Sequence, residues 1–278
     1  MRLDCKNAMR PSTHKVRGVL RSPDAVGKFR HARIAPSEAL RPWVQHFWSV
    51  HWDLRDAKPI APETLPHTNV QLVFESAGAD VCGVSTARFT TRLEGQGSVF
   101  GVKFRPGAFR PILGKSVSTL RDRTVPIGAV FGADGRALER EVRGVDSDAD
   151  KAALVETFLR GRSDAADSQI ERVGRIVDEI ADNRELVRVE QLVDRWGIGR
   201  RPLQLLFNEY VGVGPKWVIG RYRLHEALER LHEGRTLNYA QLATDLGYFD
   251  QAHFIRDFRK LVGCAPAAYA RRSSVRNP

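Results

Sequence analysis

Cysteine is scarce in this sequence, and long apolar stretches are missing. Cys5, Cys82 and Cys264 are scattered over 278 residues without a C-x-x-C pair, so neither a zinc ribbon nor a disulfide framework is expected. No apolar run reaches the length of about 18 residues that a membrane-spanning helix needs, and the N-terminal segment lacks the apolar core of a signal peptide. We therefore expect a cytoplasmic protein with no membrane partner.

Motifs of enzymes and of metal sites are missing as well. The sequence contains no G-x-S-x-G elbow, no phosphate-binding P-loop and no convincing pair of catalytic carboxylates. His46 and His51 are an odd number of residues apart on one expected strand, so they should lie on opposite faces, and His67 has no acidic or cysteine partner at ligand spacing. We therefore expect no catalytic residues, no metal and no cofactor.

The net charge of +11 is concentrated in two parts of the chain. Residues 1–33 hold 9 Lys and Arg against 2 Asp and Glu, and residues 168–278 hold 18 against 14, whereas residues 34–167 are balanced. A basic arm and a basic C-terminal region suit a polyanionic partner such as DNA. For the arm itself, a solvated or disordered tail explains the composition equally well.

One helical pattern occurs twice in the C-terminal region. Residues 238–271 predict two short helices joined at Gly247, and the second helix has Phe254, Phe258 and Leu261 on its inward face. Residues 189–218 repeat the same arrangement upstream. The inward residues of that upstream unit are Leu203, Phe207 and Tyr210.

The outer faces of the two second helices are polar and basic. In the upstream unit the outer residues are Arg200, Arg201, Gln204, Leu205 and Asn208, and in the downstream unit they are Gln251, Ala252, Ile255, Arg256 and Arg259. One such face is usually just a solvated surface. Two units with the same inner and outer faces favour a pair of helix-turn-helix motifs whose second helices read DNA. A helix over residues 215–232 is expected to connect them.

The downstream unit also fits the pattern G-[FY]-x-[DS]-x-x-x-F-x-R-x-F-[KR]-x-x-x-G-x-x-P-x-x-[YF]. The matching residues are Gly247, Tyr248, Asp250, Phe254, Arg256, Phe258, Arg259, Gly263, Pro266 and Tyr269. With this pattern the region resembles the C-terminal DNA-binding domain of AraC/XylS transcription regulators, and Arg223, Leu224 and Ala227 fit the connecting helix. Gly199 and Leu205 depart from it, because the family commonly has a capping Ser and an Arg there. The first reading helix is therefore expected to read less, or differently.

The N-terminal half predicts several short strands separated by turn residues, such as 44–54, 69–75 and 98–104. The side chains expected on one face of the first strand are Val44, Trp48, Val50, Trp52 and Leu54, with His46 as an interruption. The expected fold class is α+β, with a β-rich barrel or cupin-like sensor domain before an all-α domain of two helix-turn-helix units. The run GVKFRPGAFRPILG, followed by VPIG, resembles a pattern in the β-rich sensor halves of one uncharacterised branch of the same family.

A small-molecule pocket is predicted in the N-terminal half. The candidate lining residues are Trp48, Trp52, Phe104 and Arg105, with His51 nearby, because an aromatic cavity with a few polar groups is the usual form of such a site. An aromatic strand face is also typical of plain core. The expected domains are a basic arm at 1–33, a sensor and dimerisation domain at 34–160, a linker at 161–167 and the DNA-binding domain at 168–278.

Together these features predict a sequence-specific DNA-binding transcription regulator that responds to a small-molecule effector. Its expected partners are double-stranded DNA, the effector, a second copy of the chain in a homodimer and, for an activator, RNA polymerase. The alternative is a DNA-repair or DNA-modifying protein that uses the same reader to deliver a catalytic N-terminal domain. Cys82 has no neighbouring His, Lys or Arg to activate its thiol, which disfavours this alternative.

Overall fold

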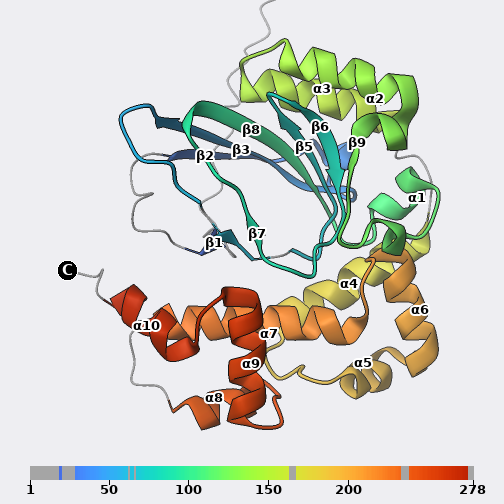
Figure 1. The fold of residues 1–278 in the computed structure, drawn as a ribbon. Helices are drawn as coiled ribbons and strands as arrows, with labels where there is room; N and C mark the ends of the chain where they lie inside the picture. Colours follow the sequence, from blue (N-terminus) through green and yellow to red (C-terminus); the bar gives the residue numbers. More distant parts are fainter. Residues whose placement is uncertain are drawn as a thin grey trace, which may run out of the picture.

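The computed structural model describes residues 19–20, 29–61, 63–65, 67–162, 167–232 and 238–274. An antiparallel sheet region is followed by a helical region (Figure 1), so the expected α+β class is confirmed. Most of the expected arm at residues 1–33 lies outside the described residues. Its last part is not an arm, because β2 (Phe29–Ile34) pairs with β3 (Val44–Leu54) along its whole length.

The main sheet has six strands in the order β2-β3-β8-β5-β6-β9, and all its pairs are antiparallel. Its other strands are β5 (Gln71–Glu75), β6 (Gly78–Cys82), β8 (Gly95–Phe104) and β9 (Thr124–Pro126). A smaller sheet is formed by β1 (Val19–Leu20), β4 (Glu63–Thr64) and β7 (Phe89–Thr90). The expected barrel is wrong, because β2 and β9 are the two edges of the main sheet and do not pair with each other.

Helices cover one face of the main sheet in place of barrel closure (Figure 1). The helical elements of this region are η2 (Glu38–Leu40), α1 (Phe109–Leu113), η3 (Val117–Leu120), α2 (Ile127–Arg143) and α3 (Asp148–Arg160). Ser147 caps α3 by accepting the Asp150 backbone N–H. Helix α2 is interrupted near its start by a break with positive φ at Gly132.

The helical region begins where Asp167 caps α4. Its helices are α4 (Ser168–Asp182), α5 (Val189–Trp196), α6 (Arg200–Tyr210), α7 (Pro215–His232), α8 (Tyr239–Asp245), α9 (Gln251–Val262) and α10 (Pro266–Ser274). The middle of the expected linker, residues 163–166, lies outside the described residues. Within the described ranges, no helix is both long and apolar enough to cross a membrane.

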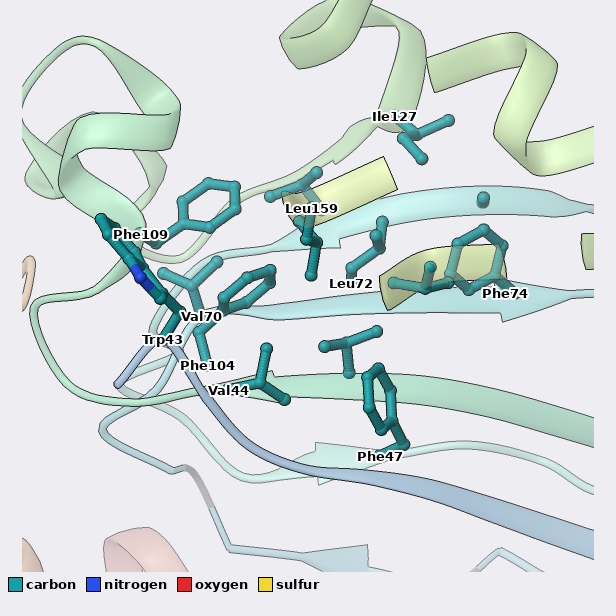
Figure 2. Packing of buried hydrophobic residues seen from close by; sticks show 14 of the residues in the cluster. Trp43, Val44, Phe47, Val70, Leu72, Phe74, Phe104, Phe109, Ile127 and Leu159 are labelled. Carbon is teal, nitrogen blue, oxygen red and sulfur yellow. The ribbon is translucent and has the colours of Figure 1, made fainter. Parts of the chain in front are cut away.

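The main core lies between the sheet and helices α2 and α3 (Figure 2). Phe47, Leu72 and Phe104 are fully buried in it. Phe104 packs against Phe109 of α1 with ring centroids 4.8 Å apart. The helix-covered face of the sheet is therefore filled by apolar side chains, and the opposite face is left for other contacts.

A β-bulge near the start of β3 decides which of its side chains join the core. The register with β8 shifts between Val44 and His46, so Val44 and Phe47 both face the helices and are fully buried. Trp48 and Trp52 face the opposite side, together with His46. The predicted grouping of Val44 with the tryptophans was wrong, because one extra residue in a strand reverses the alternation that follows it.

Candidate DNA-binding interface

The upstream helix-turn-helix unit consists of α5 and α6. Leu203 and Phe207 of α6 are fully buried, which confirms the predicted inward stripe at these positions. Tyr210 is only partly buried, and its hydroxyl donates to Oδ2 of Asp167 at 2.7 Å. Burial and the neighbouring Asp167 carboxylate raise the pKa of Tyr210 to about 12. Gly199 precedes α6 without a side chain to cap it, as the sequence indicated.

The downstream unit consists of α8 and α9. Asp250 caps α9 by accepting a backbone N–H of its first turn at 2.7 Å. Phe254 and Phe258 are fully buried, as predicted. Gly247 joins the two helices with a φ of 76°, and a Cβ atom there would collide with the side chain of Val187. Glycine is therefore required at this turn for both its backbone conformation and its size.

Most of the predicted contact residues lie on the surface. The exposed ones are Arg200, Arg201, Gln204 and Leu205 of α6 and Gln251, Ala252, Arg256 and Arg259 of α9. Ile255 is partly buried against the core of the downstream unit, and Asn208 is partly buried as well. Phe249, which the sequence analysis did not single out, is 93% exposed directly before α9.

The C-terminal end of α6 contacts the sheet region. Arg121 donates to Oδ1 of Asn208 at 3.3 Å, and the Ser116 hydroxyl donates to the Asn208 carbonyl at 3.2 Å. Arg110 forms an ion pair with Glu209 at 2.6 Å. Asn208 is therefore engaged by the N-terminal region. Sequence reasoning missed this contact, because the partners lie 87 to 99 positions apart and no local pattern marks them.

The connecting helix α7 is part of the cores of both units. Val218 and Ile219 belong to the core of the upstream unit, whereas Leu224 and Leu228 belong to that of the downstream unit. A change in the angle between the units would have to disrupt one of the two cores. This shared helix therefore holds the two reading helices at a fixed separation.

A buried arginine fixes α7 to its neighbours. Arg223 donates to the carbonyl of Ile180 in α4 at 2.8 Å and to Glu226 at 2.6 Å. Glu226 also accepts a bond from Arg230, which pairs with Asp245 of α8 at 2.9 Å. Burial lowers the pKa of Arg223, and the Glu226 carboxylate acts in the opposite direction. The network joins α4, α7 and α8.

The four candidate pocket residues do not line one cavity. Trp48 and Trp52 lie over two glycines of β8 on the sheet face that α2 and α3 do not cover. Phe104 is buried in the core on the other face. Arg105 is exposed, and its Nε donates to the backbone carbonyl of Arg41, between η2 and β3, at 2.6 Å. The pocket as predicted is wrong, because the bulge in β3 places the tryptophans and Phe104 on opposite faces.

Two protein-family models match this chain. Residues 32–126 match a domain of unknown function, DUF6597, and residues 192–272 match a helix-turn-helix domain. The second match covers α6 to α9, which include both reading helices, and most of α5 and α10. The helix-turn-helix pair inferred from the repeat is therefore confirmed.

Two curated relatives are similar to part of this chain. A putative HTH-type transcriptional regulator of Escherichia coli K12, YkgA, is 34% identical over 88 residues, which are 31% of this chain and 36% of the relative. The F1 operon positive regulatory protein of Yersinia pestis is 33% identical over 99 residues, 35% of this chain and 33% of the relative. The chain thus spans about a third of the length of these curated relatives.

Among solved structures, apo ToxT from Vibrio cholerae aligns with a TM-score of 0.40 and 14% identity, over 81% of this chain and 96% of that one. The assignment rests on the helix-turn-helix match and on the relatives. These comparisons identify residues 192–272 as a helix-turn-helix domain of the AraC type, and this part of the chain is similar to transcription regulators.

Proposed function

We propose that this protein is a sequence-specific DNA-binding transcription regulator whose N-terminal region responds to a small-molecule effector. The observation that carries the proposal is the pair of helix-turn-helix units on one shared helix, each with a polar outer face at the surface. Double-stranded DNA is the partner that such a pair fits. A homodimer, and contact with RNA polymerase if the protein is an activator, belong to the same proposal.

The length of α7 suits two successive turns of DNA. Its 18 residues span about 27 Å at 1.5 Å per residue. With the widths of the two units added, the reading helices would lie on the order of 34 Å apart, which is one turn of B-DNA. One chain would then contact two successive major-groove segments on the same face of the duplex.

The two half-sites should differ in sequence. Arg256 of α9 can donate two hydrogen bonds to one guanine, whereas Leu205 of α6 offers no donor. The side chain of Leu205 is 60% exposed, and an exposed apolar side chain on a reading helix can contact the methyl group of thymine. The half-site read by α9 should therefore tolerate fewer base changes than the half-site read by α6.

The alternative, a DNA-repair or DNA-modifying protein, requires a reactive nucleophile in the N-terminal region. Burial raises the pKa of the Cys82 thiol, and the hydrogen bond from Thr124 opposes this only in part. A thiol held in its protonated form is a poor nucleophile. We accordingly propose a regulator without catalytic activity of its own.

Selection of bound sequences from random DNA, followed by footprinting with the full-length protein, tests the proposal. The expected result is an asymmetric site protected over two successive major-groove segments by one chain. Arg140→Ala, at an exposed arginine of α2 far from both reading helices, should leave the footprint unchanged. Protection of a single groove segment, or a palindrome bound only by dimers, would contradict the proposed geometry.

A further inference from the structure

The turn between α8 and α9 carries an apolar side chain that the two helix pairs do not use. Phe249 lies directly before Asp250, the residue that caps α9, and its ring is almost entirely in solvent. Among the described residues, the other exposed large apolar side chain is Leu205, on the outer face of α6. Single exposed apolar residues are common on protein surfaces. The position of Phe249, more than its exposure, therefore decides what it can bind.

The residues on either side of Phe249 are held in place by contacts within the unit. Tyr248 turns inward, and its ring lies against the rings of His253 and Phe254, with centroids 5.2 and 5.4 Å away. On the other side, the Asp250 carboxylate accepts the backbone N–H of His253 at 2.7 Å. Because both neighbours are fixed in this way, the turn directs Phe249 outward.

The upstream unit shows that the turn can be built without Phe249. There a single residue, Ile198, lies between the glycine with positive φ and the N-cap residue of α6, and it is buried in the core of that unit. In the downstream unit two residues, Tyr248 and Phe249, lie between the equivalent positions. Tyr248 packs against the core as Ile198 does. Phe249 is therefore the additional residue, and its side chain is available for a partner.

The surroundings of Phe249 suit DNA as that partner. The first turn of α9 contains no acidic residue, and its outer residues Gln251 and Ala252 are exposed and uncharged. Arg256 follows on the exposed face one turn after Ala252. The small side chain of Ala252 lets this end of α9 approach a partner closely, and the partial positive charge of a helix N-terminus favours nearby phosphate groups.

The place of Phe249 on the reading unit also indicates which part of DNA it meets. In a bound helix-turn-helix unit, the N-terminal residues of the second helix contact base edges in the major groove. Phe249 lies at that end of α9, on the side of the helical region away from the main sheet (Figure 1). The apolar group on the base edges of the major groove is the methyl group of thymine, and phenylalanine is one of the side chains that contact it.

We propose that Phe249 contacts the 5-methyl group of a thymine in the half-site read by α9 and makes the protein specific for thymine at that position. This assigns a further specificity-determining residue to the proposed function and so rests on it. Arg256 would supply hydrogen bonds to guanine, whereas Phe249 would supply an apolar contact in the same groove segment. The upstream turn has no equivalent residue, so the requirement for this thymine would belong to one half-site alone.

Replacement of thymine by deoxyuridine tests this contact, because the two nucleotides differ only by the methyl group. The half-site read by α9 is the one at which Arg256→Ala relaxes the base preference. Each thymine in it is replaced in turn, and fluorescence anisotropy gives the dissociation constant of the full-length protein. At one thymine the replacement should weaken binding by about three- to fivefold, the effect of removing one methyl group from an apolar contact.

Two substitutions of Phe249 and one control assign the contact to this side chain. In Phe249→Ala the weakening by deoxyuridine at that thymine should vanish, because no ring remains to contact the methyl group. Phe249→Leu keeps a large apolar side chain and should retain the weakening. Lys260→Ala, at an exposed lysine near the other end of α9, should show the same weakening as the wild type. Urea unfolding of each variant shows that it is folded.

The proposed function and the thymine contact fail in distinguishable ways. A protein that selects no DNA sequence would refute both. Specific DNA binding without a methyl-sensitive thymine in the half-site read by α9 would refute the contact alone. A methyl effect that persists in folded Phe249→Ala would do the same, because another residue, such as Ala252, would then contact the methyl group. If Phe249→Ala altered self-association in sedimentation but not DNA binding, the ring would belong to a protein interface and the proposed contact would be wrong.

Discussion

Arg256 occupies the exposed face of α9, where an arginine can donate two hydrogen bonds to O6 and N7 of guanine. Arg256→Ala should therefore weaken binding to the selected site by about 1–3 kcal/mol and affect random DNA much less. Gln251 of α9 and Arg201 and Gln204 of α6 should behave in the same way. Fluorescence anisotropy with both kinds of DNA measures the difference. An equal loss on both would identify phosphate contacts.

Lys103 should make stability depend on pH in a particular direction. Its pKa in the folded protein is about 8, below the ordinary value of 10.5 for a lysine, so between these values the unfolded chain binds the extra proton and stability rises with pH. Below about pH 8 the buried charge costs on the order of 3 kcal/mol. Lys103→Met should be more stable than the wild type at pH 7, and the gap should narrow by pH 10. Urea titrations of both proteins measure it, and a constant gap would contradict the assigned shift.

Sequence reasoning succeeded for residues whose role is set by near neighbours in the chain. The burial of Phe254 and Phe258 follows from their helical spacing, and the capping role of Asp250 follows from its place directly before a helix. Lys103 gave no such signal, because its surroundings come from β2, β3, the loop before β5 and α7, which only the tertiary structure brings together. The same is true of Arg121, whose partner belongs to the other domain.

At the scale of single elements, two phenylalanines near the start and middle of α9 offer a matched comparison. Phe258 is fully buried, whereas Phe249 is 93% exposed. Phe258→Ala should destabilise the protein by roughly 3–5 kcal/mol, because it leaves a cavity in a packed core. Phe249→Ala should change stability little. Thermal or urea unfolding measures both, and a stable Phe258→Ala protein would mean that the inward face of α9 has been assigned incorrectly.

The elements of the helical region were predicted more accurately than those of the sheet region. The two helix pairs and the range of α7 follow from helical periodicity, from Gly247 and from the repeat. In the sheet region the strand at 44–54 was predicted at its correct limits, but its faces were not. The alternation of apolar and polar residues in a sequence does not show where a strand contains an extra residue. The bulge in β3 is therefore recognised only from its pairing with β8.

At the scale of the whole molecule, the sheet region forms hydrogen bonds with the C-terminal end of α6, the first reading helix. Arg121 donates to the Gly212 carbonyl at 2.7 Å as well as to Asn208, and a hydrogen bond from a charged group contributes about 1.5–3 kcal/mol. Arg121→Ala should therefore increase amide hydrogen exchange at the C-terminal end of α6 by about tenfold or more. Full-length protein is used, so that the contact between the regions is intact.

Arg123→Ala is the matched control for this experiment. Arg123 lies two positions away and donates to the Thr119 carbonyl within the sheet region. Exchange in α6 should be the same in Arg123→Ala as in the wild type. If Arg121→Ala also leaves α6 unchanged, the contact between the two regions does not stabilise the reading helix.

The bulge in β3 also limits how this chain can change in length. Gln45, the residue that the register with β8 skips, is exposed, and its side chain should be freely replaceable. Its deletion should be tolerated as well, because Val44, His46 and Phe47 would then follow the regular alternation of a strand and keep their present sides of the sheet. Loss of a residue after Phe47 is another matter, because the part of β3 that follows the gap would exchange one side of the sheet for the other relative to Val44 and Phe47. Related chains should therefore vary at Gln45 by substitution or by a single-residue gap, and within the rest of β3 by substitution alone.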